Sequence, residues 1–320
     1  MLYIIYPNCD YIEYVLTTLA ENKNIKLIRF ETMSRNRLLV SLMLFLRYIF
    51  KRKWFSSNIL TKENRTCLSK IKSDDKVLLF SIKDSTEIAL LKTEIMSQNI
   101  SVYLCDPIRR IKTTKIGVAL FMGFIRYSRL HYFTFDYEDA IKYKINKICP
   151  VWGYIEENLT KTCSNNSNVY YIGTQKGRGN LIAEIAEKLK SEGLKPIFQI
   201  IKNKHSEYIG SLSSFYITNP IPYNEVIKEL KDVDCILDIV QKNQTGLSFR
   251  PLEALFLNKK LITNCSSIKR EAFYDKNNVY IIGDETESRT YKEFLDAPYS
   301  QISEEIKDLY NIKEWIKQFV

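Results

Sequence analysis

The feature that most constrains the fold is a regular alternation of short apolar runs with amphipathic segments along almost the whole chain. Runs such as VLLFSI at 77–82 and VYYIGT at 169–174 are continuous and rich in β-branched and aromatic residues. Strands that are apolar on both faces are typical of parallel sheets that helices cover on each side. The alternation therefore predicts an α/β protein built from repeated strand–helix units.

A polar stretch divides this alternation into two halves. The chain has 320 residues, more than one domain usually holds, and residues 151–167 end in a Ser, Asn and Thr cluster typical of a linker. We expect an N-terminal domain over 1–150 and a C-terminal domain over 168–320, whose last helix packs back on the N-terminal one. Both would be doubly wound and Rossmann-like, with a cleft between them as the default ligand site, because ligands bind beyond the carboxyl ends of such strands.

Charge and cysteine content narrow the classes of partner and compartment. The chain has 47 Lys and Arg against 37 Asp and Glu, and its net charge of +10 favours an anionic partner such as nucleic acid, a phosphorylated substrate or an acidic membrane. Its seven cysteines are far apart and form no CxxC pair, which predicts reduced thiols in a cytoplasmic protein. We expect no signal peptide, and two histidines are too few for a histidine-based metal site.

A glycine-rich turn after the strand at 169–172 is the first candidate site. The turn GTQKGRG places three of the chain's ten glycines, a Lys and an Arg before an amphipathic helix. Free N–H groups at a helix start attract negative charge, and glycines let a ligand approach closely. The turn predicts an anion site, although an ordinary strand–helix loop with two solvated basic residues fits it equally well.

A second informative segment is DCILDIVQKNQTGLSFRPLEALFLNKKLITN at 234–264. It reads as a strand, a polar loop, a helix whose first turn tolerates Pro251, and another strand. Asn258 stands where that helix must end, and Asn accepts the left-handed conformation found there. The pattern resembles the nucleotide-sugar site of bacterial GT-B glycosyltransferases, and the Lys-Gly pair at 176–177 matches their donor-diphosphate turn. The resemblance covers the second half of the chain.

The resemblance implies a set of donor-binding residues. Glu253 would accept hydrogen bonds from the two ribose hydroxyls, a task suited to a carboxylate, although a solvated first-turn Glu is the alternative. Lys176, with Arg178, would meet the diphosphate and act catalytically by stabilising charge on the leaving nucleotide. The implied donor site comprises Gly173, Lys176, Gly177, Arg178, Gly246, Leu247, Ser248 and Glu253.

Two positions depart from the family pattern. Thr245 stands eight positions before Glu253, where retaining members usually have a second Glu. Thr174 and Gln175 occupy a shortened loop that lacks the usual Arg before the Lys. The resemblance therefore leaves the anomeric outcome of a transfer open.

Acidic residues next to the predicted strands are the candidates for a catalytic base and for a metal site. The resemblance implies a base just after a strand of the first domain, where Asp10, Asp84 and Asp106 qualify by position, with Asp10 as the candidate and a helix cap as the alternative for each. The single Asp-x-Asp at 232–234 precedes its strand, so it would lie at the opposite edge of the sheet in a turn. We therefore expect no metal and no cofactor, the nucleotide-sugar being a substrate.

Two basic, apolar segments suggest a membrane surface. Residues 35–53, RNRLLVSLMLFLRYIFKRK, hold an apolar run shorter than the about 20 residues that span a bilayer. Such a helix is typical of segments that lie in the interface and pair with anionic headgroups. Residues 112–129 repeat the pattern, and a core helix is the alternative for both. The expected membrane contacts are Arg35, Arg37, Arg47, Lys51, Arg52 and Lys53.

These patterns, with the resemblance, predict a glycosyltransferase that acts on the inner face of the cell membrane. It would move a sugar from a nucleotide-sugar to a lipid-linked oligosaccharide in O-antigen, capsule or lipopolysaccharide assembly. Nucleic acid is not expected, because no recognition module is present. A dinucleotide-binding oxidoreductase stays open, although GRGNLI departs from the G-x-G-x-x-G spacing. A non-catalytic nucleotide-sugar-binding partner of the polysaccharide machinery stays open too.

Overall fold

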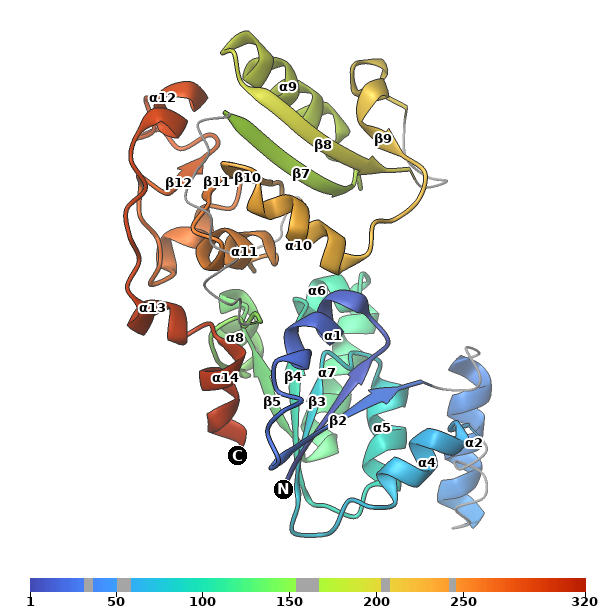
Figure 1. Cartoon of the computed structure of the whole chain (residues 1–320). Helices are drawn as coiled ribbons and strands as arrows, with labels where there is room; N and C mark the ends of the chain where they lie inside the picture. The colour runs from blue at the N-terminus through green and yellow to red at the C-terminus, as the bar shows by residue number, and fades with distance from the viewer. Residues whose placement is uncertain (32–36, 51–58, 154–166, 203–207, 242–245) are drawn as a thin grey trace. The chain divides into compact units, whose positions relative to one another are not determined.

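The chain folds into two compact units, each with its own parallel sheet (Figure 1). The computed structural model describes residues 1–31, 37–50, 59–153, 167–202, 208–241 and 246–320. Unit 1 comprises Met1–Pro150 and Trp315–Val320, and unit 2 comprises Val151–Glu314. Each sheet has six strands, and every strand pairing within it is parallel. The predicted α/β class with two Rossmann-like domains is confirmed.

Unit 1 has the sheet order β2-β1-β3-β4-β5-β6, so the winding direction reverses between β1 and β3. Its strands are β1 (Leu2–Pro7), β2 (Ile25–Phe30), β3 (Lys76–Phe80), β4 (Asn99–Leu104), β5 (His131–Thr134) and β6 (Asn146–Lys147). Its helices are α1 (Asp10–Thr17), α2 (Arg37–Phe50), α4 (Lys62–Leu68), α5 (Ser85–Glu94), α6 (Ile108–Ile111), α7 (Lys115–Ser128) and α8 (Tyr137–Tyr143).

The end of the chain completes the core of unit 1. Trp315 packs its ring against Tyr103 and Phe80, with ring centroids 4.8 and 6.0 Å away, and its indole N–H donates to the Cys149 carbonyl over 3.0 Å. Phe319 meets Phe133 edge-on at 5.2 Å. The last residues are therefore part of unit 1, although 164 residues of unit 2 separate them from the rest of it.

A buried carboxylate joins two helices of unit 1. Asp139 in α8 accepts a hydrogen bond from the Ile108 backbone N–H at the start of α6, over 2.6 Å. Burial, together with the neighbouring carboxylates of Asp136 and Glu138, raises the pKa of Asp139 to about 6, although the Ile108 N–H and Lys142 oppose the shift. The folded chain therefore holds this proton more tightly than the unfolded chain does.

Asp139→Asn is expected to stabilise unit 1 at pH 8 and to lose that advantage near pH 4. A carboxyl whose folded pKa is raised weakens folding as the pH rises from its unfolded value toward its folded value, and Asn keeps an oxygen for the Ile108 N–H. The gain at pH 8 should be on the order of 1 kcal/mol. Thermal denaturation of both proteins between pH 4 and 8 measures it, and a difference independent of pH would contradict the assignment.

Unit 2 has the order β12-β11-β10-β7-β8-β9, in which the chain starts in the middle and reverses between β7 and β10. Its strands are β7 (Asn168–Thr174), β8 (Lys195–Ile201), β9 (Tyr216–Ile217), β10 (Cys235–Asp238), β11 (Lys260–Thr263) and β12 (Val279–Ile281). Its helices are α9 (Gly179–Ser191), η2 (Gly210–Phe215), α10 (Tyr223–Lys231), α11 (Arg250–Phe256), η3 (Ser266–Arg270), α12 (Tyr291–Asp296) and α13 (Glu304–Asp308). The chain then runs into α14 (Ile312–Trp315) and η4 (Ile316–Phe319).

Two local predictions for unit 2 are confirmed. The amphipathic helix expected after the GTQKGRG turn is α9, whose apolar face buries Ile182, Ile185, Ala186 and Leu189, with Leu181 half-buried beside them. Asn258 follows α11 with a φ of 52°, the left-handed conformation that ends a helix, and the next residue's N–H closes the turn on the Ala254 carbonyl over 2.8 Å.

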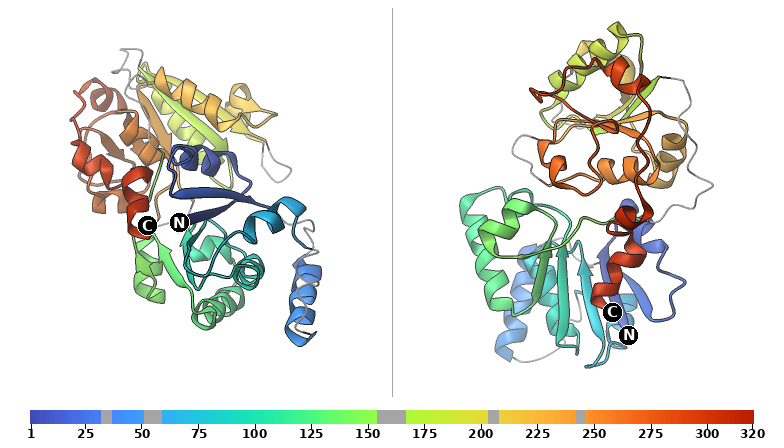
Figure 2. Two further views of the ribbon diagram at one scale, coloured as in Figure 1. Left: turned by 60° about the horizontal axis from the view of Figure 1, so that its bottom comes forward. Right: turned by 90° about the vertical axis from the view of Figure 1, so that its left-hand side faces the viewer.

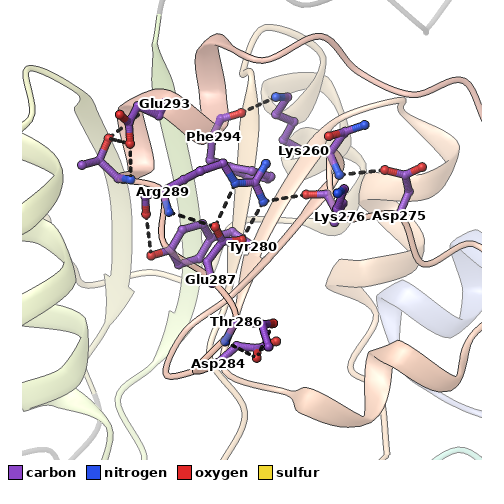
Figure 3. Close-up of polar contacts among 12 residues, drawn as sticks. Lys260, Asp275, Lys276, Tyr280, Asp284, Thr286, Glu287, Arg289, Glu293 and Phe294 are labelled. Atoms are coloured by element: carbon purple, nitrogen blue, oxygen red, sulfur yellow. Dashed lines mark hydrogen bonds and ion pairs between the residues drawn. The ribbon is translucent and has the colours of Figure 1, made fainter.

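Polar contacts fasten the segment after β12 to the sheet (Figure 3). The buried Lys260 ammonium of β11 donates to the Phe294 and Ala297 carbonyls at the end of α12. Arg289 donates through Nε to Glu287 and through Nη2 to the Lys276 carbonyl, both over 2.8 Å. These contacts satisfy a buried cation and fix the C-terminal part of unit 2.

The basic, apolar segment 35–53 is in part helix α2, and one of its cations differs from expectation. Arg47 points at α5, where it pairs with Glu94 and donates to the Thr93 carbonyl, so that only 15% of its side chain is exposed. The predicted membrane contact of Arg47 is therefore wrong, because its guanidinium is bound to α5. Arg35, Lys51, Arg52, Lys53 and the side chain of Arg37 lie outside the described residues. In the described ranges, no helix is long and apolar enough to cross a membrane.

Candidate functional site

The turn between β7 and α9 holds the first predicted donor residues. Lys176 and Gly177 are exposed, and both have left-handed φ values of 45° and 76°, which a glycine adopts without strain. The Arg178 N–H donates to the Gln175 carbonyl over 2.9 Å and closes the turn directly before α9. Gly173 still belongs to β7, where it pairs with Ile200 of β8. Lys176 therefore stands at the carboxyl edge of the sheet, beside the N-terminus of α9.

Arg178 connects the ends of two neighbouring strands. Its Nε donates to the Gln175 carbonyl over 3.0 Å and its Nη2 to the Thr174 carbonyl over 2.6 Å, both at the end of β7. Its Nη1 donates to the Ile239 carbonyl, directly after β10. Arginine has five N–H donors, so two remain without an acceptor among the described residues. The guanidinium holds the reversal point of the sheet together, and its contact with a diphosphate stays a prediction.

Glu253 lies in a closed hydrogen-bonded network. Its side chain is 0% exposed, and its carboxylate accepts from Arg250 Nη1 over 2.8 and 2.9 Å and from the Tyr223 hydroxyl over 2.7 Å. The Tyr223 oxygen in turn accepts from the Trp152 indole N–H over 2.9 Å. Each carboxylate oxygen retains acceptor capacity, but a ribose must first gain access to it, so the ribose role of Glu253 stays a prediction.

Charges in this network favour a cationic arginine and a neutral tyrosine. Burial lowers the pKa of Arg250, but the Glu253 carboxylate outweighs it and the pKa rises. Burial and Glu253 both raise the pKa of Tyr223 far above its ordinary value, so its hydroxyl stays a donor. Arg250 Nη2 also donates to the Ile172 carbonyl of β7 over 3.0 Å. Arg250 is thus the second guanidinium bonded to the end of β7.

Asp238 ends β10 between these two arginines. It is buried and accepts hydrogen bonds from the Ser248 hydroxyl over 2.8 Å and the Thr263 hydroxyl over 3.0 Å. Burial raises its pKa, while the two hydroxyls and the charges of Arg250 and Arg178 oppose the shift. Ser248, a predicted donor residue, is therefore engaged in holding Asp238 in place.

The structure brings the two predicted donor segments to one sheet edge. β7 and β10 are adjacent, and the arginine bonds to Ile239 and Ile172 cross between them. Gly246 and Leu247 are buried in the second segment, while Lys176 is exposed in the first. Sequence reasoning missed four residues of this edge, of which only Arg250 has a local signal, its three-residue spacing from Glu253. The four are Trp152, Tyr223, Asp238 and Arg250.

The three candidate bases of unit 1 have different surroundings. Asp84 caps α5, accepting from the Thr86 and Glu87 N–H groups over 2.9 and 3.4 Å. Asp106 pairs with Lys83 and Arg110. Asp10 is exposed at the start of α1, and no hydrogen bond or ion pair ties its carboxylate within the described part of the chain. Of the three, Asp10 retains an available carboxylate.

The Asp-x-Asp pair lies where the sequence predicted. Asp232 ends α10, and Asp234 accepts from the Asn168 N–H over 3.2 Å, where β10 and β7 begin. The pair is thus at the edge opposite the candidate donor site, where Asp234 binds the backbone of β7. No group of His, Cys, Asp and Glu suited to a metal ion occurs within the described ranges.

Comparison with known proteins shows the fold of the chain. No family model matches it, and no curated protein sequence does. The α,α-trehalose-phosphate synthase (UDP-forming) from Burkholderia xenovorans, solved with glucose-6-phosphate, is similar over 99% of this chain and 98% of its own, with a TM-score of 0.59 and 9% identity. The synthase from Burkholderia multivorans gives a TM-score of 0.55 at 8% identity, over 100% and 97%. The chain therefore shares the GT-B fold expected from the resemblance.

Proposed function

We propose that the protein is a glycosyltransferase whose donor, a nucleotide-sugar, binds at the carboxyl edge of β7 and β10. The observation that carries this proposal is the exposed Lys176 beside the N-terminus of α9, at the point where the winding of unit 2 reverses. The similar synthase from Burkholderia xenovorans is UDP-forming, which supports a leaving nucleoside diphosphate.

The proposed reaction needs charge stabilisation on the leaving group and a base for the acceptor. An acceptor hydroxyl attacks the anomeric carbon, the bond from that carbon to the phosphate oxygen breaks, and its electron pair stays on the diphosphate. Lys176 and the first-turn N–H groups of α9 stabilise this charge, without need of a metal or another cofactor. Asp10 is our candidate to take the proton of the hydroxyl, because its carboxylate is exposed.

Lys176→Ala is expected to weaken binding of a nucleoside diphosphate about tenfold or more, because one charge-assisted contact contributes roughly 1.5–3 kcal/mol. Calorimetry or thermal shift with UDP, GDP and CDP measures the affinity. Lys195→Ala is the matched control, since Lys195 is an exposed lysine at the amino end of β8. If folded Lys176→Ala binds the nucleotide as tightly as the wild type, the donor site is elsewhere.

For the acceptor, we propose a lipid-linked oligosaccharide of O-antigen, capsule or lipopolysaccharide assembly, met on the inner face of the cell membrane. Support comes from α2, whose Leu38, Leu42 and Phe45 are exposed on a helix within a basic segment. The test is sugar transfer to a lipid-linked oligosaccharide compared with the same glycan free of lipid. Equal transfer to both would contradict the lipid-linked acceptor.

One observation favours a second candidate, a nucleotide-sugar-binding partner that does not catalyse transfer. Both Glu253 and Arg178 are engaged by groups of the protein itself. Nucleotide affinity without release of nucleoside diphosphate from any sugar nucleotide, in the presence of acceptor, would favour this candidate over the enzyme.

A further inference from the structure

Exposed apolar side chains gather on two helices of unit 1. Seven of the thirteen large hydrophobic residues that are exposed within the described ranges lie on α2 and α7. On α7 they are Ile116, Leu120 and Tyr127, which are 75%, 71% and 87% exposed. Because these positions are 4 and 11 residues apart, they share one face of the helix. Isolated exposed apolar residues are common, but a row of them marks an interaction surface.

The opposite face of α7 already packs on the core of unit 1. Phe121 and Met122 are buried there, and Phe124 and Ile125 pack against the same core. The row at Ile116, Leu120 and Tyr127 is therefore additional to what the fold needs. A core helix therefore does not explain these three exposed apolar side chains.

Helices α2 and α7 flank α5 in a single layer of unit 1 (Figures 1 and 2). The C-terminal ends of the three helices are tied together, since Arg47 of α2 pairs with Glu94 of α5 and Lys92 of α5 donates to the Ser128 carbonyl of α7. Helices that follow parallel strands run in the same direction. The exposed rows of α2 and α7 are consequently two parallel apolar ridges on one helical layer.

The charge of this unit fits an anionic surface. Residues 1–150 hold 25 of the 47 Lys and Arg but only 14 of the 37 Asp and Glu, a net charge of +11, so they account for the whole net charge of +10. Beside the row on α7, Lys115, Arg126 and Arg129 are exposed. Long basic side chains next to aliphatic ones are the combination that binds an anionic bilayer in its interface.

We propose that the outward faces of α7 and α2 form one lipid-binding surface, which places unit 1 on an anionic bilayer. This inference rests on the proposed function, in which the acceptor is lipid-linked. It adds which surface of unit 1 binds the membrane and that the lipid headgroups are acidic. Ile116 and Leu120 enter the acyl boundary, while Lys115, Arg126 and Arg129 meet acidic headgroups. No bilayer crossing is involved.

The apolar part of the surface is tested by a matched pair of variants in the full chain. Sedimentation with vesicles that contain phosphatidylglycerol measures binding of wild type, Ile116→Gln and Ile141→Gln. Ile141 on α8 is 78% exposed, against 75% for Ile116, but belongs to neither row. Ile116→Gln should weaken binding about tenfold or more, as expected for a lost buried isoleucine, and Ile141→Gln should leave it unchanged. Equal effects of the two changes would overturn the assignment.

The charged part is tested by lipid composition and by a second variant. Wild type should bind phosphatidylglycerol vesicles at low salt, release them at high salt, and bind pure phosphatidylcholine weakly. Lys115→Gln with Arg126→Gln should reduce binding to the acidic vesicles. Equal binding to both lipids would overturn the proposal. Sedimentation of the wild type without vesicles, abolished by Ile116→Gln, would also overturn it, because the surface would then bind a second copy of the chain.

Release of nucleoside diphosphate with a lipid-free acceptor separates this inference from the proposed function. Transfer to the soluble acceptor with no vesicle binding would contradict the lipid surface alone. Vesicle binding that responds to Ile116→Gln, with no transfer to any acceptor, would support the surface and contradict the enzyme.

Discussion

Replacing Glu253 by Ala is expected to destabilise unit 2 by about 3–5 kcal/mol, because it leaves the Arg250 guanidinium buried without its counterion. Tyr223 loses its acceptor in the same change. Native-state hydrogen exchange of the β7 and β10 amides measures the effect. Arg250 donates to the Ile172 carbonyl of β7, and β10 is paired with β7.

A paired change distinguishes the lost ion pair from a lost cavity filler. Glu253→Gln with Arg250→Met removes both charges while keeping the volume, so it should recover more than half of the stability lost in Glu253→Ala. A double variant no more stable than Glu253→Ala would show that the ion pair is not the cause. Nucleoside diphosphate affinity of the folded double variant then tests the ribose role of Glu253 separately.

Arg178→Ala is expected to cost about 3 kcal/mol or more in unit 2, because three charge-assisted hydrogen bonds to carbonyls are lost together. The same variant should bind nucleoside diphosphate more weakly, since the turn that presents Lys176 loses its support. Urea denaturation and calorimetry provide the two measurements.

Arg178→Lys is the informative companion to this variant. An ammonium cannot reach the carbonyls of Gln175, Thr174 and Ile239 together, so Lys should restore charge but little of the stability. A fully stable Arg178→Lys would mean that charge, rather than the fork of the guanidinium, matters at this position.

Much of the fold was predictable because its strands are short, apolar and regularly spaced. Segments such as 77–82 and 169–174 correspond to β3 and β7, and the polar Asp-x-Asp at 232–234 lies before β10 as expected. The order of the strands was not predictable, because pairing β7 with β10 depends on packing between residues more than 60 positions apart.

The site was predictable only where it is local. The turn holding Lys176 follows from a strand, three glycines and a helix in immediate succession. By contrast, Tyr223 reaches Glu253 from another helix 30 residues away, and no spacing in the sequence indicates that contact. Arg47 is a local prediction that a non-local contact overturned. A basic residue in an apolar segment was expected to face a membrane, but it pairs with Glu94 of α5, which is far away in the sequence.

The place of Trp315 in unit 1 has a consequence for synthesis of the protein. Its ring lies against Tyr103 and Phe80, yet the 164 residues of unit 2 are translated between them and it. At about 5–20 residues per second, roughly 10–30 s pass between the emergence of Pro150 and that of Trp315. During this interval Phe80 and Tyr103 lack their final aromatic partner, so the core of unit 1 cannot be completed until the whole of unit 2 has been synthesised.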